Sequence, residues 1–255
     1  MAVRSLFNFF IDLCYSMPSV TFVSAFIDIG SNVKSTEHRM RLFKHLADSG
    51  IPIHLFLSSS FIEEYYRVVG EAKNVRVEPV ELEDLETYKE IADLDYIVPN
   101  SANPSKDTAK YHIVQNAKIE LVDKVRRLNE TTHYAWIDFN ICQIFRNIPE
   151  CMAYLSGKLR LEDGLSIPGC WPLGTNTVED KMFLSIHWRF CGGFFVGDAK
   201  SVERFYKVYR EKFRGLVQET RILSWEVNVW HYLELSGLLK PNWYIADHDD
   251  SIIWS

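Results

Sequence analysis

The hydrophobic positions alternate between short apolar runs and longer stretches that mix apolar and polar residues. Residues 20–29, 51–57 and 75–80 are apolar runs rich in β-branched or aromatic residues, and each predicts a buried strand. Residues 35–48 and 58–69 lie between these runs and predict helices. Because strands and helices alternate, the pattern predicts an α/β fold with a mostly parallel central sheet and helices on both faces.

The rest of the chain predicts further elements with less regular spacing. Apolar residues at steps of four indicate a helix over 107–128, and HYAWI at 133–137 indicates a short strand. Several Gly and Pro residues over 157–181 predict a long irregular insertion, and 186–197 reads as a strand interrupted by two glycines. The remaining predicted helices span 81–95, 199–214 and 223–236.

Length and composition favour one folded domain. The chain has 255 residues, of which 47% are hydrophobic, and this excludes a disordered chain. No repeat or linker divides it, so we predict a single domain over 20–255 and a helical extension over 1–19 that packs on the domain or contacts a membrane surface. The formal net charge of −6 argues against a general nucleic-acid-binding protein.

The cysteines and the absence of a long apolar run point to a cytoplasmic protein. There are five cysteines, an odd number, and none forms a C-x-x-C pair, so their spacing gives no zinc signature and no disulfide framework. No apolar run reaches the roughly 18–20 residues of a transmembrane helix. Asp12 interrupts the apolar stretch near the start, which therefore makes a poor signal peptide.

The first candidate for chemistry is the strand at 133–137, which runs directly into Asp138. A carboxylate at the carboxyl end of a parallel strand lies where open α/β sheets bind ligands. Asn140 alternates with Asp138, so both oxygens could face one Mg²⁺ or Mn²⁺ ion that bridges phosphates. The alternative is that both residues only cap the next helix.

Two further motifs follow later in the chain. Gly192 and Gly193 within a predicted strand suggest close approach by a ligand, although a β-bulge needed only for packing gives the same pattern. They match neither a P-loop nor a G-x-G-x-x-G fingerprint. Asp198 follows them and is suited either to a catalytic carboxylate or to the N-cap of the next helix. Glu226 lies on a predicted helix beside tryptophans and is either a sugar-facing acid or part of an amphipathic helix.

The order of these motifs resembles nucleotide-sugar-dependent glycosyltransferases of the GT-A fold, and is closest to the HtrL/YibB-like group. The resemblance runs from Val20 to Asp250. The strand from Thr21 to Asp28 resembles the nucleotide-binding first strand, and a helix followed by HYAWIDFNI resembles the strand that ends in Asp-x-Asp. RFCGGFFVGDAKSVERFY and SWEVNVW resemble the acceptor-side segments of retaining transferases related to the blood-group enzymes.

This resemblance implies a GT-A-like domain that transfers a sugar from a UDP- or GDP-sugar to a glycan or other hydroxyl acceptor, with Mn²⁺ or Mg²⁺ as cofactor. It implies metal ligands at Asp138, Asn140 and His248, although Asn140 stands where the family has a second Asp. It assigns catalytic roles to Glu226 and Asp198. The implied nucleotide-sugar-binding residues are Thr21, Asn116, Lys118, Trp136, Asp138, Arg189, Gly192 and Gly193.

Two other function classes stay open. Asn140 weakens the metal motif and is compatible with a non-catalytic module that binds sugar or protein. A nucleotidyl- or phosphotransferase would also use Asp138 and a metal, but would need a phosphate-binding glycine loop. The aromatic residues beside the polar candidates are expected to contact sugar or base: Trp136, Phe139, Trp188, Phe194, Trp225 and Trp230.

Overall fold

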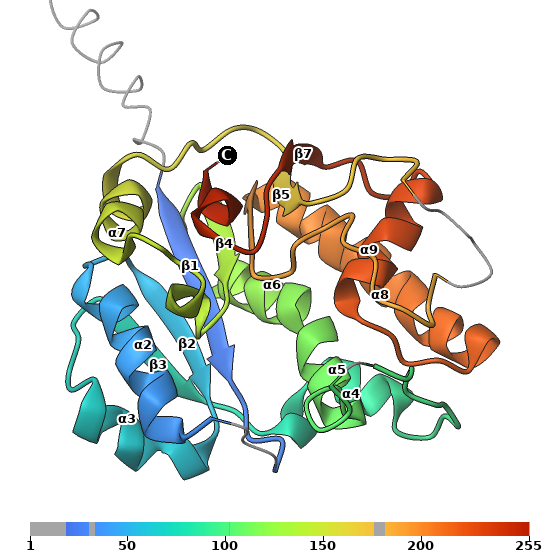
Figure 1. Cartoon of the computed structure of the whole chain (residues 1–255), viewed down its shortest axis with the longest axis horizontal. Coiled ribbons are helices and arrows are strands. Elements are labelled where there is room, and N and C mark those ends of the chain that lie inside the picture. The colour runs from blue at the N-terminus through green and yellow to red at the C-terminus, as the bar shows by residue number, and fades with distance from the viewer. Residues whose placement is uncertain (1–18, 31–33, 102, 176–181, 255) are drawn as a thin grey trace, which may run out of the picture.

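The computed structural model describes residues 19–30, 34–101, 103–175 and 182–254, so the extension predicted over 1–19 lies outside it except for residue 19. Within these ranges the strands form one seven-stranded sheet in the order β3-β2-β1-β4-β6-β5-β7 (Figure 1). Only β6 runs antiparallel to its neighbours, β4 and β5. The prediction of an α/β fold with a mostly parallel sheet is confirmed. The strands are β1 (Val20–Phe26), β2 (Ile53–Leu57), β3 (Val75–Pro79), β4 (His133–Ile137), β5 (Leu165–Gly169), β6 (Phe194–Asp198) and β7 (Asn242–Ile245).

Helices cover both faces of the sheet, as the sequence predicted. Side chains alternate between the faces along each strand, so Ala135 and Ile137 of β4 join one hydrophobic core, while Tyr134 and Trp136 join the other. The first core contains α2 (Thr36–Asp48), α3 (Ile62–Val68) and α7 (Ile148–Gly157). The second contains α4 (Glu86–Ile91), α5 (Ala109–Asn116), α6 (Lys118–Leu128), α8 (Ala199–Thr220) and α9 (Glu226–Leu235).

Short 3-10 helices join several of these elements. They are η1 (Ser59–Phe61), η2 (Leu82–Asp84), η3 (Ile141–Gln143) and η5 (Asp250–Ile253). The acidic segment predicted as one helix over 81–95 therefore divides into η2 and α4. Among the described residues, no helix combines the length and the apolar character needed to cross a membrane.

The helix predicted over 107–128 is interrupted at Ala117 and forms α5 and α6. Asn116 explains the interruption, since its side-chain amide donates to the carbonyl oxygens of His112 (2.7 Å) and Ser224 (2.9 Å). The second bond ties the end of α5 to the segment before α9, and α6 starts afresh from Ala117. The interruption places Lys118 at the first position of α6.

Two predictions for the region between 157 and 197 are wrong. The predicted irregular insertion contains β5, whose Pro168 and Gly169 concealed it because these residues are rare in strands. The predicted strand over 186–197 is strand only from Phe194 onward. The chain before it folds against β5, where the amide of Cys191 donates to the carbonyl of Pro168 (2.7 Å).

The sheet changes direction of winding between β1 and β4. The chain passes from β1 through α2 to β2 on one face, whereas α5 and α6, which lead into β4, cover the other face. Strand β1 is hydrogen-bonded to both β2 and β4, all parallel. Such a switch point leaves a crevice beyond the carboxyl ends of the two diverging strands, which is where open α/β sheets bind ligands. Asp138 follows β4 at this edge.

Candidate functional site

A buried lysine joins the residues at the carboxyl edge of the sheet. The side chain of Lys118 is only 2% exposed, and its Nζ lies 2.8 Å from Glu226 Oε1 and 3.2 Å from Asp138 Oδ1. Nζ also donates to the carbonyl oxygen of Gly192 at 2.8 Å. These three oxygens match the three hydrogens of the ammonium group. Lys118 therefore ties α6, the end of β4, the glycine segment and α9 together.

The two carboxylates keep Lys118 charged. Burial by itself would lower the pKa of this lysine, but Asp138 and Glu226 outweigh burial and raise its pKa above the usual value. The side chain is thus an ammonium throughout the neutral range. An ion pair buried in this way is costly to break, since the remaining partner would be a buried charge without compensation.

Asp138 is the open member of this cluster. Its amide donates to Gly193 O (2.9 Å), and its Oδ1 accepts from the indole nitrogen of Trp136 (2.7 Å). The side chain is 38% exposed. Its second oxygen, Oδ2, lies 3.6 Å from the place where a Cβ on Gly193 would stand. One oxygen of Asp138 is therefore fixed by its neighbours, while the side chain stays partly exposed at the carboxyl edge of the sheet.

The two glycines are needed for close packing around this cluster. A Cβ on Gly192 would lie 2.1 Å from Glu226 Oε1, and one on Gly193 would lie 3.1 Å from Ile252 Cδ1 and 3.2 Å from Ile141 Cδ1. Sequence reasoning left open close approach by a ligand or packing alone. At Gly192 the group that approaches is the chain's own glutamate.

Arg39 on α2 and Tyr111 on α5 are two residues that sequence reasoning missed. Arg39 is half-buried beside the ring of Phe26 (5.5 Å from guanidinium carbon to centroid), and its buried Nε has no hydrogen-bond partner among the described residues. Burial lowers the pKa of Arg39, whereas nearby Tyr111 raises it. The pKa of Tyr111 is well above its usual value because of burial and then the charges of Glu226 and Asp138. Tyr111 is therefore within electrostatic range of Glu226 and Asp138 and also of Arg39.

A signal for Arg39 was present in the helical periodicity. It precedes Phe43 by four residues and Leu46 by seven, so it lies on the apolar stripe of α2. An arginine on a buried stripe needs a partner, and within the described chain this one has none for its Nε. A guanidinium is a group of the kind that binds phosphate oxygens.

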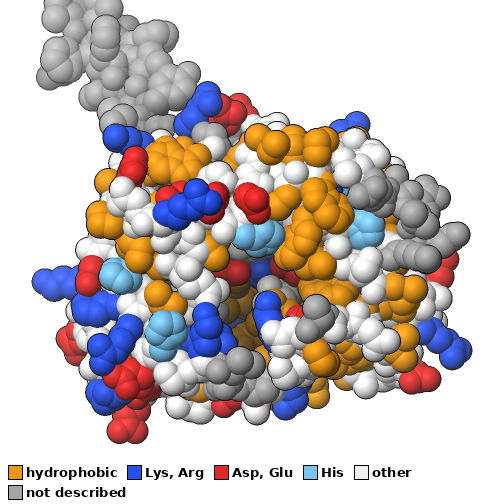
Figure 2. All heavy atoms as spheres, viewed as in Figure 1, with side chains coloured by type: hydrophobic (Ala, Val, Ile, Leu, Met, Phe, Trp, Pro, Cys, Tyr) orange, Lys and Arg blue, Asp and Glu red, His pale blue; other side chains and the backbone are white. Residues whose placement is uncertain are grey.

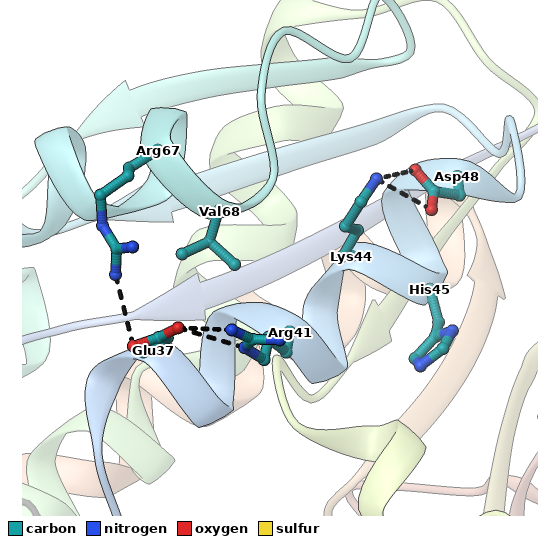
Figure 3. Close-up of a pocket in the computed structure, with 7 residues that line it drawn as sticks. All are labelled: Glu37, Arg41, Lys44, His45, Asp48, Arg67 and Val68. Atoms are coloured by element: carbon teal, nitrogen blue, oxygen red, sulfur yellow. Dashed lines mark hydrogen bonds and ion pairs between the residues drawn. The ribbon is translucent and has the colours of Figure 1, made fainter.

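The space-filling view shows the hollow at this edge of the sheet. Figure 2 shows a face that is hollowed near its centre, with acidic and basic side chains on the floor of the hollow. A separate cavity of about 410 Å³ lies between α2 and α3, lined by Glu37, Arg41, Lys44, His45, Asp48, Arg67 and Val68 (Figure 3).

This second cavity is a poor candidate site. Its charges pair with one another, since Arg41 and Arg67 both contact Glu37 and Lys44 contacts Asp48. These side chains are between 42% and 69% exposed, so they form an open, mutually neutralised surface. The cavity between α2 and α3 therefore has the volume for a ligand but no unpaired charges among the described residues that line it. We place the candidate site at Asp138 because a ligand needs polar groups that are available to bind it.

Two of the predicted site residues lie at the opposite edge of the sheet. Asp198 pairs with His133 where β4 begins and the antiparallel β6 ends, and its carboxylate accepts from the amides of Lys200 and Ser201 as the N-cap of α8. Thr21 pairs with Tyr134 near the start of β1. Neither residue reaches Asp138, so the catalytic assignment of Asp198 and the nucleotide assignment of Thr21 are corrected. The alternative of Asp198 as a helix cap is confirmed.

Two other predicted site residues, Arg189 and Asn116, make buried hydrogen bonds to other parts of the protein. Both oxygens of Glu234 accept from Arg189 (2.7 and 2.6 Å), and the guanidinium lies over Trp243. The oxygen of the Asn116 side chain accepts from Tyr209, which completes its hydrogen bonds. Arg189 and Asn116 are both buried, and we withdraw them as donor-binding residues.

Burial also changes the roles of Lys118, Glu226 and Trp136. All three side chains are buried and do not face a ligand directly. Lys118 and Trp136 contact Asp138, and Glu226 contacts Lys118. The expected aromatic contacts fail for the same reason. The rings are packed into the core in all cases but Trp188, which is half-buried: Trp136, Phe139, Phe194, Trp225 and Trp230 are between 0% and 6% exposed.

The predicted metal ligands are only partly brought together. Asn140 makes no capping bond, and its buried Oδ1 has no partner among the described residues. This unpaired oxygen and Asp138 offer hard oxygen donors that suit Mg²⁺ or Mn²⁺, which would complete its shell with phosphate and water. His248 instead lies beside two cysteines, with its Nδ1 3.9 Å from Cys170 Sγ.

Comparison with known proteins identifies the family. Residues 54–225, more than half of the chain, match the model of the HtrL_YibB family, described as a bacterial protein of unknown function. The chain belongs to this family. The matched region contains Lys118, Asp138 and both glycines, and it ends just before Glu226. No curated protein matches the chain.

Two solved structures are similar at low identity. One is a glycosyltransferase involved in glycosylation of the major capsid of PBCV-1, with 10% identity, a TM-score of 0.40 and coverage of 90% of this chain and 82% of that one. The other is the bifunctional IspDF from Campylobacter jejuni, with 10% identity and a TM-score of 0.41. The similarity covers 90% of this chain and 49% of that enzyme, about half its length. At these TM-scores neither likeness supports a conclusion about activity.

Proposed function

We propose that this protein is a glycosyltransferase that uses a nucleoside-diphosphate sugar and binds it in the crevice beyond β1 and β4. One observation carries the proposal. Asp138 stands at the switch point of the sheet with Oδ1 held by Trp136 and Lys118 and with the rest of its carboxylate exposed. A carboxylate that is pre-oriented in this way suits a donor whose diphosphate is bound through a divalent metal ion, since the ion needs a fixed anionic ligand.

The residues around Asp138 supply the charges that sugar transfer requires. Negative charge builds on the diphosphate as it leaves, and an oriented cation stabilises that charge. Arg39, a half-buried cation on α2 within electrostatic range of Tyr111, is the group we assign to the diphosphate. Asp138 and Asn140 would hold Mn²⁺ or Mg²⁺, which supplies further positive charge to the phosphates when bound. Lys118 acts as a positioning residue because it contacts Asp138, and Glu226 acts through Lys118.

The test is a thermal-shift comparison of UDP, GDP and CMP, with and without Mn²⁺, followed by assays for hydrolysis of UDP- and GDP-sugars. We expect one diphosphate to raise the melting temperature in a metal-dependent way. Asp138→Asn should abolish this shift. Arg39→Ala should weaken nucleotide binding about tenfold or more, the usual effect of losing a charged hydrogen bond.

Arg41→Ala is the matched control. Arg41 lies on the same helix but is exposed and paired with Glu37, so its loss should leave nucleotide binding unchanged. No shift with any nucleotide, or the same shift in Asp138→Asn, would refute the proposal. Binding without turnover would instead support the second candidate, a non-catalytic sugar-binding module, which the replacement of an aspartate ligand by Asn140 favours.

A further inference from the structure

Two cysteines and a histidine from three distant segments meet beside the candidate site. Cys170 follows β5, Cys191 precedes the glycine pair, and His248 follows β7. The two Sγ atoms are 3.4 Å apart, and Cys170 Sγ is 3.9 Å from His248 Nδ1. All three ligand atoms lie within 4.8 Å of one another. The sequence did not predict that these three residues meet, because Cys170 and Cys191 are 21 positions apart and Cys191 and His248 are 57 positions apart.

Backbone hydrogen bonds hold the three segments in this arrangement. The amide of Cys170 donates to Trp188 O (3.0 Å), and the amide of Cys191 donates to Pro168 O (2.7 Å). The segment that carries His248 is tied to β5, since the amide of Ala246 donates to Gly169 O (2.9 Å). The His248 ring also packs edge-on against Trp188, with 4.2 Å between ring centroids. The cluster is therefore built by the sheet and does not depend on one exposed loop.

We propose that Cys170, Cys191 and His248 bind one soft divalent metal ion of the Zn²⁺ class. Two thiolates and an imidazole are the ligands that zinc prefers, with Zn–S bonds of about 2.3 Å and hence about 3.8 Å between two sulfurs in a tetrahedral site. The sulfurs need to move apart by only a few tenths of an ångström. Binding replaces the two thiol protons, which pass to water, so the two thiolates balance the charge of the ion.

Asp247 is the nearest candidate for the fourth ligand. Its Oδ1 lies 3.3 Å from His248 Nδ1 and 3.8 Å from Cys170 Sγ. Its side chain is 79% exposed, and its Oδ1 also accepts from the His248 amide at 2.7 Å. A metal here would fix the residue before Gly192, whose carbonyl oxygen accepts from Lys118. The inference is independent of the proposed sugar transfer, since it concerns different ligands and a different class of ion.

The test is metal analysis of the reduced protein after exposure to Zn²⁺ and removal of excess metal. We expect about one zinc per chain and, on replacement by Co²⁺, the absorption bands of thiolate ligation. Cys170→Ser and His248→Asn should each weaken zinc binding about tenfold or more. Cys142→Ala removes a buried cysteine outside the cluster and should retain the metal. Cys191 is buried, so its replacement could disturb folding. The fold of Cys191→Ala is therefore first compared with that of the zinc-free wild type by circular dichroism, and its metal content is measured afterwards.

Three results would overturn the inference. One is a wild type without stoichiometric zinc, and another is equal zinc retention in the wild type, Cys170→Ser and His248→Asn. The third is a Cys170–Cys191 disulfide in protein prepared with reductant and zinc, since a disulfide holds its sulfurs at about 2.0 Å and leaves no thiolate for the metal. Nucleotide thermal shifts measured on the same variants report separately on the proposed function.

Discussion

The ammonium of Lys118 lies between two carboxylates, and its side chain is 2% exposed. A methionine of similar length would fill the same space without the charge. The carboxylate of Glu226 would then be a buried anion with no cation beside it, while Asp138 would keep partial access to water. Replacing one partner of a buried pair in this way is far more costly than replacing both.

We therefore predict that Lys118→Met lowers the free energy of unfolding by about 3 kcal/mol, at the lower end of the range for broken buried pairs because Asp138 is partly exposed. Urea unfolding followed by circular dichroism measures this. Lys124→Met is the control on the same helix, since Lys124 is 44% exposed in its pair with Glu78 and should cost under about 1 kcal/mol. An equal decrease in the free energy of unfolding in both variants would contradict the prediction, since the buried ion pair would then contribute no more than the exposed one.

At the scale of single elements, the N-terminus of α8 explains Asp198. The Asp198 carboxylate accepts from Lys200 N (2.8 Å) and Ser201 N (2.9 Å), two amides that the helix itself leaves unpaired. It also accepts from Gly164 N at 2.6 Å. A negative charge at this end is favourable to the helix as well. These bonds lower the pKa of Asp198, although burial opposes them, so the cap is ionised at neutral pH.

Asp198→Ala should lower the free energy of unfolding by about 1–2 kcal/mol through loss of the cap, and should leave nucleotide binding unchanged because α8 begins at the far edge of the sheet. Asp198→Asn keeps a capping oxygen and should lose less. Glu203→Ala, at a partly exposed position on the same helix paired with Lys207, serves as the neutral control. Loss of nucleotide binding in folded Asp198→Ala would restore the catalytic assignment of this residue.

At the scale of the whole molecule, the buried histidines of the described chain include His54, His112, His187 and His231. Burial lowers the pKa of each below the ordinary 6.5. The unfolded chain therefore takes up protons near pH 6.5 that the folded chain does not, and the folded state loses stability as the pH falls through this range. At His231 both ring nitrogens are buried without a hydrogen-bond partner in the described chain, and burial lowers the pKa despite the opposing charge of Glu234.

We predict that the free energy of unfolding decreases between pH 7.5 and 5.5, by up to about 1.4 kcal/mol per histidine for each pH unit below the unfolded value. Urea titrations at several pH values measure the slope. His231→Phe should reduce the slope, whereas His45→Gln, at an exposed position on α2, should leave it unchanged. An unaltered slope in His231→Phe would mean that this ring gains its proton as easily in the folded state.

The sequence by itself determined the first half of the fold and the position of Asp138. Strands β1, β2, β3 and β4 and helix α2 follow from apolar runs, helical spacing and an N-cap at Ser35, all of which act between residues close in the chain. Asp138 could be placed at the carboxyl edge of the sheet because it follows a buried strand in an alternating pattern. The family could be recognised from the order of the motifs.

Only the tertiary structure decided what surrounds Asp138. Lys118 and Glu226 meet across 108 positions, and Cys170 meets His248 across 78. Asp198 lies at the far edge of the sheet because β6 runs antiparallel to β4. The direction of a strand within a sheet cannot be predicted from the local pattern of residues. The structure also shows which polar residues of the site are buried, such as Lys118 and Glu226, and that Asp138 is partly exposed. These outcomes depend on which distant surfaces pack together, and periodicity along the chain carries information only about neighbours.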